Sequence, residues 1–379
     1  MESWDFPIED LKGCKRRRER LIGKCRFYIS ADDFSPKKTG KSKLIGVYLD
    51  ISNIPLKKRK HANSGYLLAL IERKKFKTSG HSFKSLFSKL TKIFIKLANE
   101  GVEIDEKKYF GAISALCADN LSLNEQIGLR QSFGKAFTCR WCPAKHEDLK
   151  RSQNEKWVQQ EFDFELITHP HQYRLFIFED VPGCTPLNIS PPDPFHDLSQ
   201  GVVSYFFTDF FFPAMTKISK IELILNQLNN FKLRTGGVYL TSFNCFSTIK
   251  GVTKMEILAR CEQIFDKLIA KVDKNVLLLL DNIRDFCRKI FDIEFKEEDI
   301  QNIQTLSLSI NKLANDLSPG MTKPKFHFLL HYPSALKYFG PLSMFNTIRY
   351  ERMHQIHKNW TTITKRMNGM ARILSERYQ

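Results

Sequence analysis

The chain has 379 residues, of which 42% are hydrophobic, so it can bury a large core and is not a disordered tail. Its 59 lysines and arginines stand against 41 acids, and the resulting net charge of +18 favours a polyanionic partner, with nucleic acid ahead of an anionic membrane surface. The most apolar run, at 206–212, is too short to cross a bilayer, so we expect no membrane-spanning segment. Nine cysteines without an apolar signal segment indicate a reducing compartment.

Three short basic runs, at 15–18, 57–60 and 73–77, are predicted to be loops. Such clusters can contact phosphate groups, and the first can also act as a nuclear import signal. The alternative explanation for the charge is ordinary solubility.

The first third of the chain predicts strand, strand, strand, helix, strand. The predicted strands lie at 24–32, 43–52, 65–72 and 109–118. Apolar residues at helical spacing predict an amphipathic helix from Phe83 to Gly101, and the last strand is almost uncharged, as a strand covered on both faces would be. This order, with acids after the first and fourth strands, is typical of an RNase H-like core. Because these two strands are neighbours in that topology, we expect Asp32 and Asp119 to approach each other.

A large helical insertion is predicted after the fourth strand. Asp193 is placed to cap a helix that begins at Pro194 and runs to about Phe212, and it also makes a candidate polar or ligand pair with His196. Further helices are expected at 218–231, 252–272, 274–291, 297–316 and from 347 onward.

The predicted fold class is mixed α/β, with an RNase H-like mixed sheet flanked by helices. We expect a basic N-terminal segment, a first part of the core with the paired cysteines, a mostly helical insertion, and a closing part with the paired histidines and a last helix. Their boundaries are 1–23, 24–143, 144–320 and 321–379.

Two pairs of metal-ligating residues predict a structural zinc site. Cys139 and Cys142 are separated by two residues, so both thiolates can reach one ion, and His327 and His331 have the spacing that places both imidazoles on one face of a helix. If no metal binds, the thiols are packing residues, as we predict for the other seven cysteines. The alternative ligands close to the cysteines are His146, His169 and His171.

Asp32, Asp119 and Glu351 form a candidate site for two divalent cations, Mg2+ or Mn2+. Carboxylates around such a pair let one metal activate water or a 3′ hydroxyl while the other stabilises the leaving oxygen of a phosphodiester. Asp33 competes with Asp32 for the first position, and turn chemistry is the alternative explanation for acids at strand ends. The other competing acids are Glu103, Asp105, Asp193 and Asp197.

Five motifs, in order, resemble those of the transposases of CACTA-group DNA transposons and related element-derived proteins. They are Asp32-Asp-Phe-Ser-Pro36, Ala118-Asp-Asn-Leu-Ser122, Thr138-Cys-Arg-Trp-Cys142, Pro191-Pro-Asp-Pro-Phe-His-Asp-Leu-Ser-Gln-Gly201, and the closing segment from Lys325 through His331 to Arg349-Tyr-Glu-Arg-Met-His354. The resemblance covers residues 24–358.

The resemblance implies a DDE transposase-like core that performs Mg2+-dependent cleavage and strand transfer of DNA. By this analogy the acids are Asp32, Asp119 and Glu351, the Cys and His pairs hold zinc, and the partners are transposon ends and target DNA. It also implies a nuclear protein that works as a homodimer and has no membrane partner.

The sequence departs from the family pattern at Ala118, where the family has glycine, and at Ser35, where it more often has Asn or Glu. Because the chain begins almost at the first strand, we expect a fragment, a degenerate copy or a host-adopted derivative. The alternative function is a catalytically inactive DNA-binding or scaffold protein that retains the fold and the zinc. Convergence of the three carboxylates around two metal positions would separate these alternatives.

Overall fold

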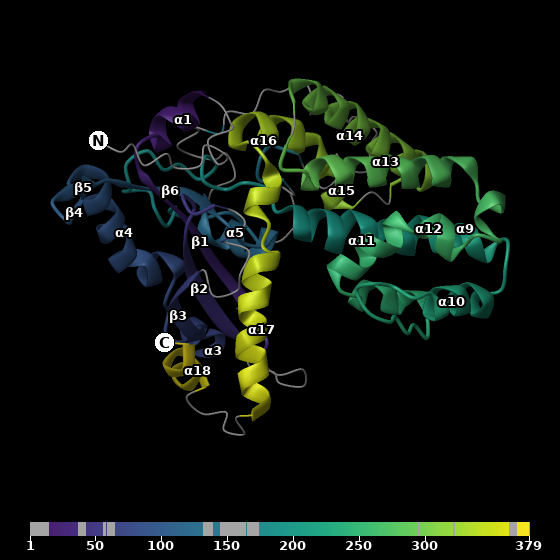
Figure 1. Ribbon diagram of the computed structural model, residues 1–379, viewed down its shortest axis with the longest axis horizontal. Coiled ribbons are helices and arrows are strands. Elements are labelled where there is room, and N and C mark those ends of the chain that lie inside the picture. Colours follow the sequence, from purple (N-terminus) through teal and green to yellow (C-terminus); the bar gives the residue numbers. More distant parts are fainter. Residues whose placement is uncertain are drawn as a thin grey trace. The chain divides into compact units, whose positions relative to one another are not determined.

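The chain forms two compact units in the computed structural model (Figure 1). Unit 1 comprises Met1–Ser132, Asp163–Asp193 and Ala335–Gln379, and unit 2 comprises Phe133–Phe162 and Pro194–Ser334. The structure describes residues 15–36, 43–55, 58, 65–131, 139–144, 164, 174–294, 296–320, 323–363 and 370–378.

A four-stranded mixed sheet lies at the centre of unit 1. Its strands follow the order β3-β2-β1-β6, in which β1 runs antiparallel to β2 and parallel to β6, and β2 runs antiparallel to β3. The bounds are β1 Cys25–Phe34, β2 Leu44–Ile51, β3 Tyr66–Glu72 and β6 Gly111–Leu116. The four predicted strands are therefore confirmed, and every residue of the uncharged strand β6 is buried.

Helices cover both faces of this sheet. Because successive residues of a strand point to opposite sides, neighbouring residues of β1 contact different helices. On one face Ile29 and Ala31 pack in a core cluster with Phe87 of α4. On the other face Phe34 stacks on His354 of α17, with ring centroids 4.4 Å apart. The covering helices are α4 Phe83–Asn99, α5 Asn120–Gln126 and α17 Ile348–Ile363.

Several short elements of unit 1 were not expected. The hairpin of β4 and β5 stands between α4 and the last core strand, and Gly101 turns the chain into it with a φ of +74°. The hairpin turn places Asp105 and Glu106 at positive φ. The additional elements are α1 Lys15–Leu21, α3 Arg73–Thr78, β4 Val102–Ile104, β5 Lys107–Tyr109, η8 Leu342–Phe345 and α18 Met370–Tyr378.

The basic runs at 15–18 and 73–77 are helical, which corrects their prediction as loops. Each contributes one buried arginine. Arg17 donates to the carbonyl oxygen of Phe339 at 3.1 Å and to the hydroxyl of Ser114 at 3.0 Å, and Arg73 pairs with two carboxylates. These two side chains therefore stabilise unit 1 and are not available to phosphate groups. In the run at 57–60, only Lys58 lies within the described residues.

All described elements of unit 2 are helical. They are η3 Phe195–Val202, α8 Val203–Tyr205, η4 Phe206–Phe211, α9 Phe212–Thr216, α10 Ile221–Asn230, η5 Phe243–Thr248, α11 Gly251–Ala259, α12 Cys261–Ile264, η6 Ile269–Lys271, α13 Lys274–Phe291, α14 Glu297–Leu317, α15 Pro324–Phe328 and η7 Leu329–His331. The helix expected at 252–272 is broken into three segments. Helix α16, Tyr332–Phe339, contains the crossing from unit 2 back to unit 1.

Of the described cysteines outside the paired motif, three agree with the predicted packing role, whereas Cys25, Cys184 and Cys245 are only partly buried. Cys117, Cys261 and Cys287 are buried, and burial raises the pKa of Cys287 to about 12, so its thiol stays protonated at neutral pH. Cys14 lies outside the described residues. No helix in the described part of the chain combines the length and the apolar character that crossing a membrane requires.

Candidate metal centre and catalytic acids

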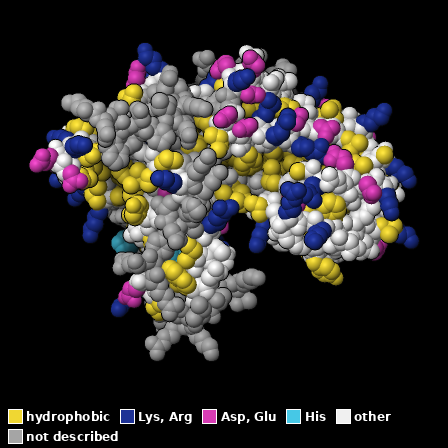
Figure 2. Space-filling view, viewed as in Figure 1, with side chains coloured by type: hydrophobic (Ala, Val, Ile, Leu, Met, Phe, Trp, Pro, Cys, Tyr) yellow, Lys and Arg dark blue, Asp and Glu magenta, His cyan; other side chains and the backbone are white. Residues whose placement is uncertain are grey.

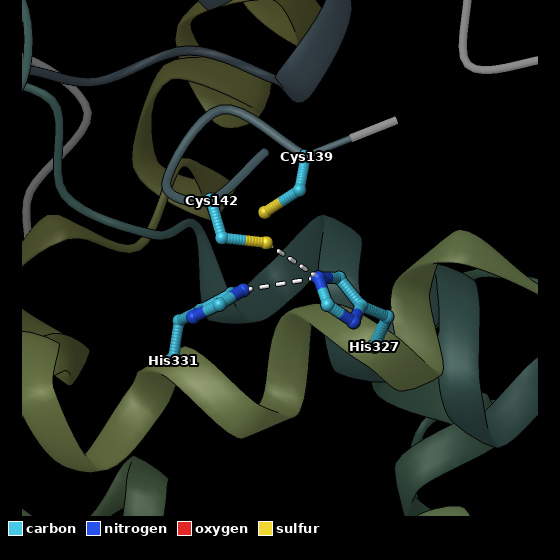
Figure 3. A group of neighbouring side chains, drawn as sticks. All are labelled: Cys139, Cys142, His327 and His331. Atoms are coloured by element: carbon cyan, nitrogen blue, oxygen red, sulfur yellow. Dashed lines mark hydrogen bonds between the residues drawn. The ribbon is translucent and has the colours of Figure 1, made fainter. Parts of the chain in front are cut away.

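Four buried side chains of unit 2 point toward one another: Cys139, Cys142, His327 and His331 (Figure 3). Their ligand atoms all lie within 4.8 Å of one another. The Sγ atom of Cys142 and the Nε2 atom of His331 each lie 3.1 Å from Nε2 of His327. The prediction that these distant residues meet is confirmed.

The two histidines come from one continuous helical stretch, in which α15 is followed by η7. Neighbouring helices hold this stretch through main-chain contacts. Asn311 of α14 donates its side-chain amide to the carbonyl oxygen of Phe326 at 2.9 Å, and Lys325 donates to the carbonyl oxygen of His196 at 2.5 Å. The two residues that precede His327 in the sequence are thereby held, which limits how far its ring can move.

Trp141, between the two cysteines, forms an apolar wall of the cluster. It is 5% exposed, and its ring lies 5.7 Å from that of Phe328 and 5.6 Å from that of His331. The guanidinium of Arg140 lies 4.3 Å from the Trp141 ring. Trp141 therefore packs inside unit 2 and shields the ligands from water.

The electrostatics of the cluster suit metal ligands. Burial by itself raises the pKa of Cys139, but a hydrogen bond with Cys142 and the charges of His331 and His327 outweigh it, so that its pKa lies well below the usual value. Burial lowers the pKa of His331 against the opposing effect of Cys139. A thiolate and a neutral imidazole are the forms that bind a metal.

The donor set fits a zinc ion. Two thiolates and two imidazoles make the Cys2His2 set of structural zinc sites, and with four protein ligands no coordination position remains for a substrate. Because the cluster is buried, a zinc ion held there would not be reached by a substrate. The alternative ligands His146, His169 and His171 lie outside the described residues.

Asp32 lies near the end of β1, and Asp119 lies shortly after the end of its parallel neighbour β6. Ile29 of β1 pairs with Leu116 of β6, and the N–H of Cys117 donates to the carbonyl oxygen of Ile29 at 2.8 Å. Each acid lies three residues beyond this pair in its own strand direction. The predicted adjacency of the first and last core strands is confirmed, and it brings both acids to the same edge of the sheet.

The two aspartates at the end of β1 lie on opposite faces. Asp33 pairs with Arg73, whose Nε lies 3.3 Å from the carboxylate, and Arg73 also binds Glu125 at 2.7 Å. Burial raises the pKa of Asp33, with Arg73 opposing this effect. Asp32 lies on the same face as Phe34, which is the face that α17 covers. Asp32 therefore lies on the face of the sheet that the helix of Glu351 covers, and Asp33 lies on the opposite face.

Glu351 lies in the first turn of α17, at the margin of the helix face that packs on the sheet. A buried charge fixes this turn: Asp50 of β2 forms an ion pair with Arg349 and accepts a hydrogen bond from the hydroxyl of Tyr350 at 3.1 Å. The sequence reasoning missed Asp50. A single acid in the otherwise apolar strand Leu44–Ile51 was the available signal, because a buried charge requires a partner.

The three carboxylates do not form a compact ligand group. Among the described residues, only one group of three or more His, Cys, Asp or Glu side chains is placed to hold a metal, and it is the Cys and His cluster. The carboxylate of Asp119 instead caps α5, accepting the N–H of Ser122 at 2.7 Å, and that of Asp32 accepts the N–H of Asp33 at 2.7 Å. One carboxylate oxygen each of Asp32 and Asp119 is therefore bound to the main chain.

The helix that follows Asp193 begins at Pro194, as predicted, and its π-helical part η3 starts at Phe195. The predicted capping role does not account for the whole carboxylate. Asp193 binds Thr347, immediately before α17. Asp193 belongs to unit 1 and His196 to unit 2, where the ring of His196 contacts that of Phe195. Capping is read from local sequence, whereas the partner of this carboxylate is distant.

No protein-family model matches this sequence, and no curated protein is significantly similar to it.

Proposed function

We propose that unit 1 is an RNase H-like DDE catalytic core that cleaves and transfers DNA strands with Mg2+ or Mn2+ bound by Asp32, Asp119 and Glu351. The observation that carries this proposal is the parallel pairing of β1 with β6, which brings Asp32 and Asp119 to the same end of the two strands, while α17, which carries Glu351, packs on β1. The strand order β3-β2-β1-β6 also agrees with the order expected for such a core.

Two divalent cations, when bound, supply an activated attacking oxygen and a stabilised leaving oxygen. The residues of this chain supply the positions of the ligands. Asp119 keeps one carboxylate oxygen on the N–H of Ser122, which leaves the other to face a metal. Glu351 is held by its neighbours in the first turn of α17, where Arg349 and Tyr350 both bind Asp50.

The zinc site has a structural role in this proposal. All four ligands belong to unit 2, and all three acids belong to unit 1. In the sequence, Cys139 follows the crossing into unit 2 at Phe133, and His331 precedes the crossing back at Ala335. Zinc would therefore link the first and last parts of unit 2, close in sequence to the two points where the chain passes between the units. The proposed chemistry belongs to unit 1.

DNA is the proposed substrate, as transposon ends and target. Its support is the net charge of +18 together with the resemblance of the five motifs. Lys and Arg side chains lie over both units on the face drawn in Figure 2. A homodimer that pairs two DNA ends and a nuclear location belong to the same proposal by analogy alone.

The test is metal-dependent nicking of DNA by the full chain and by Asp119→Asn. Asn caps a helix about as well as Asp, so this variant keeps α5 and removes the metal-binding charge. We expect nicking with Mg2+ or Mn2+ to fall by about 100-fold or more, as for loss of a major electrostatic contribution. Asp33→Asn, one residue from Asp32 on the other face, is the control and should still nick.

Two observations favour a second function, a catalytically inactive DNA-binding or scaffold protein. Among the described residues, the three carboxylates do not form a compact ligand group, although their convergence was expected of an active site. The carboxylates of Asp32 and Asp119 both accept main-chain hydrogen bonds, so each acid has a structural reason to be present without any chemistry. Equal background nicking by the unmodified chain and by Asp119→Asn, with DNA binding intact in both, would select this function.

A further inference from the structure

A cavity of about 380 Å³ lies between β3, α3 and α4 of unit 1, on the face of the sheet opposite α17. Its floor is apolar and consists of Ile71, Phe76 and Leu86. Its polar lining residues are Lys75, Ser79, His81, Ser85, Ser88 and Lys89. No acid is among the described residues that line it, and its volume falls within the range of small-ligand sites.

A row of lysines continues from this cavity along α4. Lys89, Lys92 and Lys96 are spaced by three and four residues, so they lie on one side of the helix over about 10 Å. Ile93, 53% exposed, stands among them. Within the described part of the chain these lysines form no ion pair, and the first turn of α4 contains no acid to offset them.

We propose that the cavity and this lysine row, together the α4 surface, bind single-stranded nucleic acid. One unstacked base enters the cavity against the apolar floor, and the backbone phosphates follow Lys89, Lys92 and Lys96. Positive charge along the backbone combined with an apolar contact for bases is the usual means of binding single strands.

The composition of the surface separates this ligand from other amphipathic anions. A fatty acid would fill the floor but has one head group, whereas the lysine row extends beyond the cavity. The hydroxyls of Ser79 and Ser88 donate to main-chain carbonyls at 2.7 and 2.9 Å and keep acceptor capacity for base N–H groups, which an acyl chain does not use. Because α4 and α17 cover opposite faces, this surface does not depend on the proposed metal site.

The first test asks whether the charge of the lysine row contributes to binding. The affinity for a labelled 20-nucleotide single strand is measured by fluorescence anisotropy at several salt concentrations. We expect the triple variant Lys89→Gln, Lys92→Gln, Lys96→Gln to bind more weakly and to lower the slope of log affinity against log salt by about 2. The control removes the same charge from exposed positions in unit 2, at Lys217, Lys220 and Lys232. Equal losses in both triples would show general electrostatic attraction and overturn the proposal.

The second test fills the cavity without changing charge. Ser88→Leu, on the exposed side of α4, should weaken binding of the single strand by about tenfold, the effect of losing one base contact. Asn302→Leu, at an exposed position of α14 in unit 2, should bind normally. Unchanged binding by Ser88→Leu overturns the base pocket. The base pocket is also overturned if myristate or an acidic peptide binds the chain more tightly than the single strand does and if Ser88→Leu weakens the binding of that ligand.

Discussion

Asp193 binds Thr347 through both carboxylate oxygens, one accepting the main-chain N–H at 3.2 Å and the other accepting the hydroxyl at 2.5 Å, across 154 residues of sequence. Asp193 is only 2% exposed, so its charge depends on these donors. Because Thr347 immediately precedes α17, this contact fixes the start of the helix that carries Glu351. The Pro-Pro-Asp segment thus serves a helix far along the chain.

Removing this contact should destabilise the protein. We expect Thr347→Val, which leaves the buried carboxylate without the hydroxyl, to cost about 1 to 3 kcal/mol in the free energy of unfolding. Asp193→Asn, which keeps an acceptor for the N–H, should cost less than Asp193→Ala. Urea unfolding followed by circular dichroism measures both. Additive effects of Asp193→Ala and Thr347→Val in the double variant would show that the two side chains do not interact.

Zinc content offers a direct check of the Cys and His cluster. The purified chain should contain one zinc ion, and Cys142→Ser should lose it together with several degrees of melting temperature, because metal binding contributes directly to folding. Cys184→Ser, outside the cluster, is the matched control and should keep its zinc. Metal analysis by mass spectrometry gives the answer. A full zinc content in Cys142→Ser would assign the ion to other ligands.

Two adjacent arginines should behave differently. Arg17 is fully buried and binds Ser114 and Phe339, whereas Arg16 is exposed. Arg17→Ala should therefore cost about 2 to 3 kcal/mol of unfolding free energy, and Arg16→Ala should stay within about 0.5 kcal/mol. Chemical unfolding of the two variants compares them directly. Similar stabilities would mean that the hydrogen bonds of Arg17 contribute nothing net.

The sequence predicts features whose cause is local. The strands and α13 have apolar patterns that repeat along the chain, and both zinc half-sites have ligands at fixed spacing, so their positions could be predicted. Features that depend on distant partners could not. Asp193 has the sequence of a helix cap, which does not reveal its contact with Thr347, and Arg17 lies in a basic run but is buried against Ser114. The sequence does not distinguish Asp32 from Asp33. The structure does, because α17 covers one face of β1 and Arg73 lies on the other.

The buried histidine of α17 should make stability depend on pH. Burial lowers the pKa of His357 to about 4, below the usual value of 6.5, since its ring packs against Phe34, Tyr48 and Trp360. Between these two pKa values the unfolded chain binds the proton and the folded chain does not, so protonation favours unfolding. Stability from this group is complete above about pH 6.5, falls as the pH is lowered, and levels off below about pH 4.

The loss across this window should be about 2 to 3 kcal/mol, measured by urea unfolding at pH 7 and at pH 4.5. His357→Phe replaces the imidazole with an aromatic ring that does not titrate, so its unfolding free energy should change less between the two pH values than that of the unmodified chain. His81→Gln, at an exposed site, controls for the removal of a histidine and should keep the full pH dependence. An undiminished pH dependence in His357→Phe would place the titrating group elsewhere, because the buried ring would then contribute nothing to the difference in bound protons.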